Sequence, residues 1–292
     1  SATNLAVTQC HQRLLVRPPS SGMLVAQRSA ALFAKRATRA VGIRALSQGP
    51  GAPEQEQDDV PKVVVFGGNG FVGQNVCQAA LRLGAEVVSV NRSGAPAGKD
   101  KAWKDKVRWV QADIFNQEDY AAELSGAVGA VSCVGAFGSN EKMERICGDA
   151  TVAATEAAEK AGVDNFVFIS AAGAQHKHQL LRGYWKGKQK AEKAILERRF
   201  PEGGVILRAS GIYGDRDVGP VTVPLGVFMR PMEMLFSLPP ISALRRASPL
   251  EAILTPPVAV DNVSRVAAAG ALGLVPHGVL LIDDINRLAK DA

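Results

Sequence analysis

The chain has 292 residues, of which 47% are hydrophobic and 21% are charged, and this is the composition of an ordinary globular protein. Its formal net charge is +6, but seven of its 34 Lys and Arg residues lie within residues 1–50, where Asp and Glu are absent. The remaining sequence holds 27 basic and 28 acidic residues, which excludes a basic face for nucleic acid on the body of the protein.

Residues 1–50 have the composition of an organelle transit peptide, because Arg, Ser and Ala are abundant and acidic residues are missing. Arg36, Arg39 and Arg44 lie near the end of this segment. Arginine richness favours import into the mitochondrion, to the matrix side, with the chloroplast as the alternative and a disordered basic arm as a third interpretation. Residues 51–61 are polar, acidic and turn-rich, and we expect a linker there.

From residue 62 onward, short apolar runs alternate with longer helical patterns, which predicts a Rossmann-type α/β domain with a doubly wound parallel sheet over residues 62–292. The first strand, Lys62–Phe66, is apolar and rich in valine, as in a strand buried on both faces. A glycine turn and a helix from Gly70 to Leu83 follow it. Further strands are expected at Val87–Val90, Val107–Gln111, Ala127–Val134, Phe166–Ser170, Val205–Arg208 and Gly278–Ile282, and further helices at Glu141–Ala161, Tyr184–Phe200 and Asn262–Gly273.

The alternation breaks at residues 214–260, which contain eight prolines among apolar residues. In a doubly wound fold, a late irregular region of this kind is expected to form a small lid over the ligand crevice. A methionine and phenylalanine group there suits a small hydrophobic substrate or peripheral membrane contact, with ordinary packing as the alternative. Its members are Phe228, Met229, Met232, Met234 and Phe236. No run of 18 apolar residues occurs, so no transmembrane helix is expected.

Cysteine and histidine provide no metal signature. The four cysteines are scattered, which suits a reducing compartment. They are Cys10, Cys77, Cys133 and Cys147. His176 and His178 flank a lysine without a nearby carboxylate cluster, so an exposed loop and no metal site are expected.

The glycine motif between the first strand and the first helix predicts a dinucleotide site. Its spacing places one glycine in the tight turn, one where backbone approaches a pyrophosphate, and one where the helix packs on the strand. A purely structural turn is the alternative. The predicted cofactor contacts in this motif are Gly67, Asn69, Gly70, Phe71, Val72 and Gly73.

The end of the second strand favours NADP(H) over NAD(H). NAD enzymes place an acidic residue there for the ribose 2′-hydroxyl, whereas this chain has Asn91-Arg92-Ser93. Arg92 can pair with a 2′-phosphate, and a solvated loop arginine is the alternative. Asp113 is expected near the adenine, and Gly135 is expected to let backbone lie near the cofactor.

Ser170, Tyr184 and Lys188 are the candidate catalytic residues. Tyr184 and Lys188 are four residues apart and share a helix face, so the lysine is expected to lower the tyrosine pKa for general acid catalysis. Ser170 ends a predicted strand and is expected to polarise the same carbonyl. A tyrosine that only packs beside an exposed lysine is the alternative.

Several segments together carry a family resemblance: GGNGFVG, Asn91-Arg92-Ser93, FVFIS, LRGYWKGKQKAE, GGVILRASGIYGDRDVG and PLGVFMRPMEML. The chain resembles an atypical, extended short-chain dehydrogenase/reductase over about residues 62–285. It is most similar to an organellar plant and algal branch related to the coenzyme Q biosynthesis short-chain dehydrogenase and to the nucleotide-binding accessory subunit of respiratory complex I.

The resemblance implies cofactor and catalytic roles for the residues named above, and it adds Arg208, Gly211 and Tyr213 as a lining of the nicotinamide end. One departure concerns the helix asparagine of active reductases, because the stretch from Met143 to Gly148 contains none. Two hypotheses follow. The first is an NADPH-dependent reductase of a carbonyl, enone or quinone-like group, with Tyr184 as general acid. The second is a non-catalytic NADPH-binding subunit of a quinone-synthesising or respiratory assembly.

Overall fold

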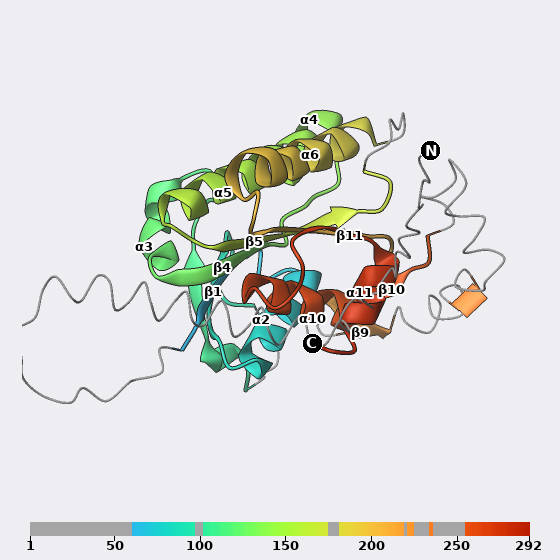
Figure 1. Ribbon diagram of the computed structural model, residues 1–292, viewed down its shortest axis with the longest axis horizontal. Coiled ribbons are helices and arrows are strands. Elements are labelled where there is room, and N and C mark those ends of the chain that lie inside the picture. The colour runs from blue at the N-terminus through green and yellow to red at the C-terminus, as the bar shows by residue number, and fades with distance from the viewer. Residues whose placement is uncertain (1–59, 97–101, 175–180, 219–220, 225–233, 236–254) are drawn as a thin grey trace, which may run out of the picture. The chain divides into compact units, whose positions relative to one another are not determined.

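The computed structural model describes residues 60–96, 102–174, 181–218, 221–224, 234–235 and 255–292. Seven strands form a sheet in the order β11-β6-β5-β4-β1-β2-β3. Figure 1 shows this sheet between two layers of helices. Every neighbouring pair in this sheet is parallel. This is the doubly wound Rossmann arrangement, and the predicted fold class is confirmed. The strands are β1 Lys62–Phe66, β2 Glu86–Asn91, β3 Val107–Gln111, β4 Ala127–Ser132, β5 Asn165–Ala171, β6 Gly204–Ala209 and β11 Gly278–Leu280.

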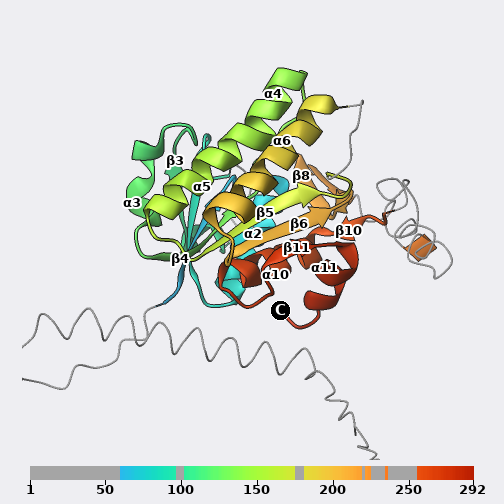
Figure 2. The ribbon, with the colours of Figure 1, turned by 45° about the horizontal axis from the view of Figure 1, so that its top comes forward.

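Helices cover both faces of the sheet. Figure 2 shows α4, α5 and α6 on one side and α2, α10 and α11 on the other. The helices before and within the first group are α3 Ala121–Leu124, which is short, α4 Asn140–Glu144, α5 Ala150–Lys160 and α6 Arg182–Lys193. The second group comprises α2 Phe71–Arg82, α10 Val260–Ala271 and α11 Ile282–Leu288. Short 3-10 turns at Lys104–Lys106 and Gln117–Asp119 precede β3 and α3.

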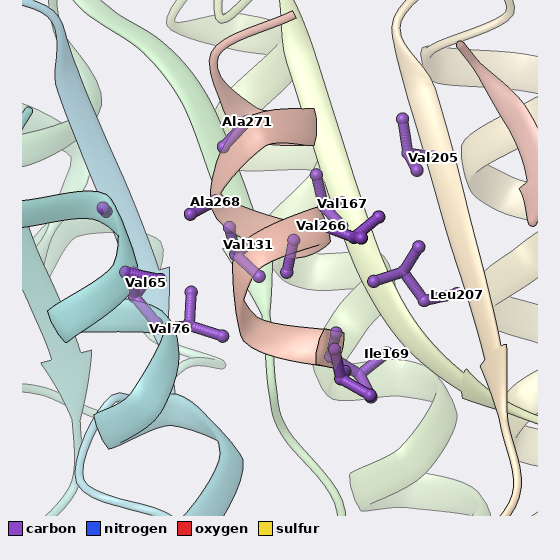
Figure 3. Close-up of a cluster of buried hydrophobic side chains, with 14 of the residues drawn as sticks. Val65, Val76, Val131, Val167, Ile169, Val205, Leu207, Val266, Ala268 and Ala271 are labelled. Atoms are coloured by element: carbon purple, nitrogen blue, oxygen red, sulfur yellow. The ribbon is translucent and has the colours of Figure 1, made fainter. Parts of the chain in front are cut away.

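The sheet separates two hydrophobic cores, because successive side chains of a strand point to opposite faces. In β1, Val63 and Val65 belong to the core under α2 and α10, whereas Val64 and Phe66 belong to the core under α5 and α6. Figure 3 shows the first core, where side chains of β1, β4, β5 and β6 meet those of α2 and α10. Burial on both faces explains why the strands are nearly continuous apolar runs.

The strand order reverses between β1 and β4, since the chain builds β2 and β3 on one side of β1 and β4, β5 and β6 on the other. Loops after neighbouring parallel strands leave the sheet in opposite directions at such a point and open a crevice at the carboxyl edge. Apart from Ser170 in β5 and Arg208 in β6, the predicted site residues follow β1, β2, β3, β4 and β5 in sequence and therefore gather at this edge.

Two predicted helices contain π-helical segments. The helix expected at Glu141–Ala161 runs as α4, a π segment at Arg145–Asp149 and α5. The helix expected at Tyr184–Phe200 begins earlier, as α6, and ends in a π segment at Ala194–Arg199.

The predicted last strand, Gly278–Ile282, was too long. β11 ends at Leu280, and Ile282 begins α11, which the sequence analysis missed. The apolar run continues across the boundary, but the Asp284 carboxylate accepts from the Leu281 amide at 3.2 Å and starts a helix there. The strand predicted at Ala127–Val134 likewise ends two residues early, at Ser132.

Part of the region predicted to be irregular is regular. β8 Asp215–Val218 and β9 Val221–Pro224 form an antiparallel hairpin, and β7 Ile212–Tyr213 pairs in parallel with β10 Val258–Ala259. Valine and threonine alternate in β9, and its proline stands at the strand end, where no ladder bond is lost.

Several expectations concern residues outside the described ranges: the transit peptide at 1–50, most of the linker at 51–61, His176 and His178, and all of the apolar lid group except Met234, which is exposed. Within the described ranges, no helix is both long and apolar enough to span a bilayer. The same ranges contain no cluster of side chains suited to a metal ion, and their three cysteines are free thiols.

Candidate functional site

A tight turn connects β1 to α2 and carries the glycine motif. Gly67 follows Phe66 with a backbone φ of +80°, a conformation that favours glycine. The Gly67 amide donates to the Val90 carbonyl of β2 at 2.9 Å, and the Gly70 amide donates to the Gly67 carbonyl at 3.0 Å. Backbone hydrogen bonds thus fix the turn, and α2 begins directly after it at Phe71.

Gly70 and Gly73 are glycines for different steric reasons. A Cβ on Gly73 would lie 2.2 Å from the Gly67 carbonyl oxygen, so the protein itself requires a glycine there. A Cβ on Gly70 would meet only that same oxygen within 4 Å, at 3.2 Å, and otherwise would point into open space. In dinucleotide-binding glycine motifs, the pyrophosphate lies in the open space above this second glycine.

The N-terminus of α2 completes an anion site. The first amides of a helix have no acceptor within the helix, and they form the positive end of its dipole. The first turn of α2 contains no acidic residue, so no side-chain charge of the turn itself neutralises this end. Phe71 and Val72, predicted cofactor contacts, form this turn and are half-buried. The residues present therefore fit a dinucleotide diphosphate.

The glycine loop is tied to the end of β2. The Asn69 side chain donates to the Ser93 hydroxyl at 2.7 Å, and the Ser93 amide donates to the Asn91 side chain at 3.1 Å. Arg92 is exposed and forms no ion pair with any described residue. Its guanidinium therefore stands in solvent beside the loop, at the position where the sequence predicts a 2′-phosphate.

Asp113 and Gly135 also lie at the carboxyl edge. The exposed Asp113 carboxylate accepts from the Phe115 amide at 3.0 Å, directly after β3. Gly135 is exposed in the loop after β4, and that loop begins beside the glycine turn, because the Cys133 amide donates to the Phe66 carbonyl at 2.9 Å. The described structure thus brings the predicted cofactor residues of the first four strands to the carboxyl edge of the sheet.

Helix α6 presents Tyr184, Lys188 and Glu192, spaced one turn apart, to the end of β5. Side chains lean toward a helix N-terminus, which for α6 lies at the carboxyl edge. The Lys188 ammonium donates to the Ile169 carbonyl at 2.6 Å and lies 4.4 Å from the Phe168 ring centroid. Burial lowers the pKa of Lys188, as expected for an ammonium moved out of water.

Tyr184 differs from the expectation. Its ring stacks on Phe137 with centroids 5.4 Å apart, and the Lys188 ammonium lies 5.7 Å from the ring centroid. Burial, with a smaller contribution from Cys147, raises the pKa of Tyr184 to about 12. The expected lowering by Lys188 is wrong for this arrangement, because desolvation of the phenolate dominates. Tyr184 is a neutral phenol, a hydrogen-bond donor rather than a base.

Ser170 also differs from the expectation. Its hydroxyl is buried and donates to the Glu192 carboxylate at 2.5 Å. A serine has a single hydroxyl proton, so while this bond holds Ser170 cannot donate to a substrate carbonyl. The residues that continue the strand and turn toward the crevice, Ala171, Ala172 and Gly173, have no hydroxyl to replace it.

Arg208, which is half-buried, completes this group. Strand register places Ser170 directly opposite Arg208 on β6. The Arg208 guanidinium binds the Glu192 carboxylate through two nitrogens, at 3.1 and 2.7 Å. Arg208 was predicted as a cofactor contact, but its charge is paired inside the protein. Ser170, Glu192 and Arg208 form what we call the buried triad, which joins α6 to two strands.

Comparison with known proteins agrees with a nucleotide-binding domain. A family model described as NAD(P)H-binding matches residues 67–223. The chain belongs to this NAD(P)H-binding family. The match begins at the first glycine of the motif and ends within β9, so it includes every predicted cofactor and catalytic residue.

Two relatives of this NAD(P)H-binding chain are named for an organelle, and a third is named for a complex. An uncharacterized chloroplastic protein of Arabidopsis thaliana is 39% identical over 235 residues, 78% of this chain and 77% of the relative. MIOREX complex component 2 of Saccharomyces cerevisiae is 43% identical over 90 residues, 30% of this chain and 32% of that protein. A mitochondrial FMP52-2 protein of Scheffersomyces stipitis is 35% identical over 113 residues, 39% of this chain and 47% of that protein.

Solved structures share the fold at low identity. The Bordetella bronchiseptica enzyme WbmG in complex with NAD gives a TM-score of 0.53 at 13% identity, covering 81% of this chain and 78% of that chain. A putative NAD-dependent epimerase/dehydratase from Bacillus halodurans gives 0.54 at 15% identity, covering 80% of this chain and all of that chain. These likenesses establish the Rossmann architecture of the NAD(P)H-binding domain and do not distinguish NADP from NAD.

Sequence reasoning missed two residues of the site in this NAD(P)H-binding chain. Glu192 follows Lys188 by four residues, and this spacing was the available signal for a third side chain on the same helix face. Phe137 is in a loop without periodicity, and its contact with Tyr184 depends on the packing of α4 beside α6. The Gly183 amide donates to the Asn140 side chain at 2.9 Å and joins the starts of these helices.

Proposed function

We propose that this protein binds NADP(H) in an organelle, and that the bound nucleotide serves as a fixed part of the protein or of an assembly rather than as a hydride donor. The observation that carries the second half is that two of the predicted catalytic side chains bond inside the protein. Ser170 donates its proton to Glu192, and Lys188 donates to a backbone carbonyl. Two of the three residues expected to perform catalysis are thus engaged in internal bonds.

The preference for NADP(H) rests on the end of β2. Arg92 is exposed beside the glycine loop, and Asn91 and Ser93 stand where an acidic residue would hold an NAD ribose. When bound, the cofactor would lie with its diphosphate at α2 and its 2′-phosphate toward Arg92.

We predict that NADPH binds roughly ten- to a hundredfold more tightly than NADH, the range for one charge-assisted contact of about 1.5–3 kcal/mol. Replacing Arg92 with alanine is expected to remove most of this difference without weakening NADH. Calorimetric titration of the wild-type and variant chains with both nucleotides measures it. Equal affinities for NADPH and NADH in the wild-type chain would contradict the proposal.

The second candidate is an NADPH-dependent reductase of a carbonyl or quinone-like group. It is favoured by Tyr184 and Lys188 on one face of α6, and by the neutral phenol, the protonation state that a general acid needs. The cofactor would supply the hydride, and Tyr184 would donate the proton.

Replacing Tyr184 with phenylalanine separates the two candidates. We predict that this variant binds NADPH like the wild type and restores the phenotype of cells lacking the chain, because a non-catalytic role needs no phenolic proton. A reductase would lose on the order of 10²–10⁴ in rate, and the variant would fail to restore the phenotype at normal abundance. Complementation with NADPH affinity measured in parallel decides between them.

The assembly and location are proposed from resemblance. The similarity to the coenzyme Q short-chain dehydrogenase and to the complex I accessory subunit suggests a quinone-synthesising or respiratory assembly, and a relative matched over 90 residues is named as a complex component. The mitochondrial location agrees with one relative's name, and the chloroplast alternative agrees with the relative matched over more of the chain. A fusion of residues 1–60 to a fluorescent protein distinguishes the organelles.

A further inference from the structure

An arginine lies on an aromatic ring at the carboxyl edge of the sheet, and neither the glycine motif nor the buried triad accounts for this contact. The Arg145 guanidinium carbon is 4.5 Å from the centroid of the Phe115 ring. Arg145 is exposed, Phe115 is half-buried, and Arg145 forms no ion pair with any described residue. Because the ring holds the guanidinium, the plane of this cation is positioned before a ligand arrives.

The helix that carries Arg145 is irregular at this residue. Arg145 begins the π segment between α4 and α5. Such segments are rare and occur often at functional sites. The same stretch, from Met143 to Gly148, is where the asparagine of active reductases is missing. It therefore presents a cation to the loop after β3 instead of an amide for proton transfer.

The contact lies at the adenosine end of the proposed nucleotide site. Phe115 follows β3 and is two residues after Asp113, which the sequence predicts near the adenine. The Asp113 carboxylate accepts from the Phe115 amide at 3.0 Å, so an acidic and a basic side chain flank the same residue. No ion pair joins these two described side chains. Two opposite charges that stay apart in this way can each bond a different atom of one ligand.

We propose that Arg145 is a positioning residue for the adenine ring, and that its guanidinium donates to a ring nitrogen of the base while Asp113 accepts from the amine of the base. Adenine carries an amine donor next to nitrogen acceptors, which matches a carboxylate beside a guanidinium. A base with a carbonyl in place of the amine would turn an oxygen toward the Asp113 carboxylate. This inference rests on the proposed NADP(H) binding and adds how the base is held.

A phosphate contact is the other role to consider for an exposed arginine. The 2′-phosphate is expected at Arg92 after β2, and the diphosphate is expected at α2, whereas Arg145 lies in the helical segment after β4. The two roles differ in what they require. A phosphate contact depends on charge, which a lysine also supplies, whereas the base contact depends on a planar guanidinium held on a ring.

The experiment titrates the full chain in a calorimeter with NADP⁺, with NAD⁺ and with deamino-NADP⁺, in which hypoxanthine replaces adenine. The variants are Arg145→Ala, Arg145→Lys and Phe115→Leu. Lys142→Ala is the control matched in charge, because it removes an exposed cation from α4 three residues earlier.

We expect Arg145→Ala to weaken NADP⁺ and NAD⁺ by the same factor, roughly tenfold, the usual effect of a hydrogen bond from a charged group. Arg145→Lys should weaken both by at least about fivefold, and Phe115→Leu by roughly threefold, because the guanidinium remains but loses its support. Lys142→Ala should stay within a factor of about two. Deamino-NADP⁺ should bind the wild type roughly tenfold more weakly than NADP⁺.

Wild-type affinity for both nucleotides in Arg145→Ala, Arg145→Lys or Phe115→Leu would overturn the proposal. An equal loss in Lys142→Ala would overturn it as well, because any cation of this helix would then act. A loss limited to NADP⁺ would assign Arg145 to the 2′-phosphate instead, and equal binding of deamino-NADP⁺ would remove the reading of the base by Asp113.

The proposed function can fail separately from this inference. If the wild type binds NAD⁺ but not NADP⁺, the proposed function is contradicted, and the NAD⁺ titrations of the same variants still test the base contact. A chain that binds neither nucleotide contradicts both.

Discussion

Replacing Gly70 with aspartate is expected to abolish NADPH binding, by at least about a hundredfold, while the protein stays folded. Gly70 is the N-cap of α2, with φ −77° and ψ 170°, a conformation that any residue adopts. Aspartate is among the best N-cap residues, since its carboxylate accepts from the first amides of the helix. In this position the carboxylate occupies the diphosphate's place and repels its charge.

The matched control is Gly73→Ala. Its Cβ would lie 2.2 Å from the Gly67 carbonyl oxygen and 2.7 Å from the Gly68 Cα, so backbone must move and stability should fall together with binding. Gly70→Asp has only the 3.2 Å contact to relieve, and its thermal midpoint should equal or exceed that of the wild type. NADPH titration and thermal melts of both variants show whether binding is lost alone or together with stability. Wild-type NADPH affinity in a folded Gly70→Asp chain would refute the assignment of this loop.

Replacing Glu192 with alanine is expected to destabilise the fold by about 3–5 kcal/mol. The change leaves the Arg208 guanidinium, whose side chain is 17% exposed, without its partner, and leaves the Ser170 hydroxyl without an acceptor. A buried unpaired charge costs far more than the net contribution of the pair. For a domain of this size, the melting temperature should fall by on the order of 10 °C.

The control for Glu192→Ala is the double variant in which Glu192 and Arg208 are both methionine. Removing both charges leaves no uncompensated ion, so this variant should recover most of the lost stability. Thermal melts of the three chains at neutral pH make the comparison. If the melting temperature of Glu192→Ala equals that of the wild type, the buried triad does not hold α6 to the sheet.

The fold was predictable because its determinants are local. Strands buried on both faces appear as apolar runs, and the glycine motif lies between the first of these and a helix. The parallel sheet was therefore predicted correctly. The strand ends at Ser132 and Leu280 were not, because in both places an apolar run continues past the last backbone hydrogen bond of the strand.

The chemistry of the site was less predictable because it depends on register and packing. Ser170 and Tyr184 have the spacing of a catalytic pair, but the direction of the Ser170 proton is set by Glu192. That contact requires the β5–β6 register and the lean of α6. The pKa of Tyr184 likewise depends on its burial, and the ring that stacks on it belongs to Phe137, a loop residue that no periodicity identifies.

A crystal structure of the full chain grown with NADPH tests the proposed nucleotide site most directly. We expect the diphosphate against the Gly70 backbone at the N-terminus of α2, the 2′-phosphate within hydrogen-bonding distance of the Arg92 guanidinium, and the nicotinamide on the β4 side of the nucleotide site. A nucleotide bound away from the β1–α2 turn, or a 2′-phosphate that Arg92 does not contact, would contradict it.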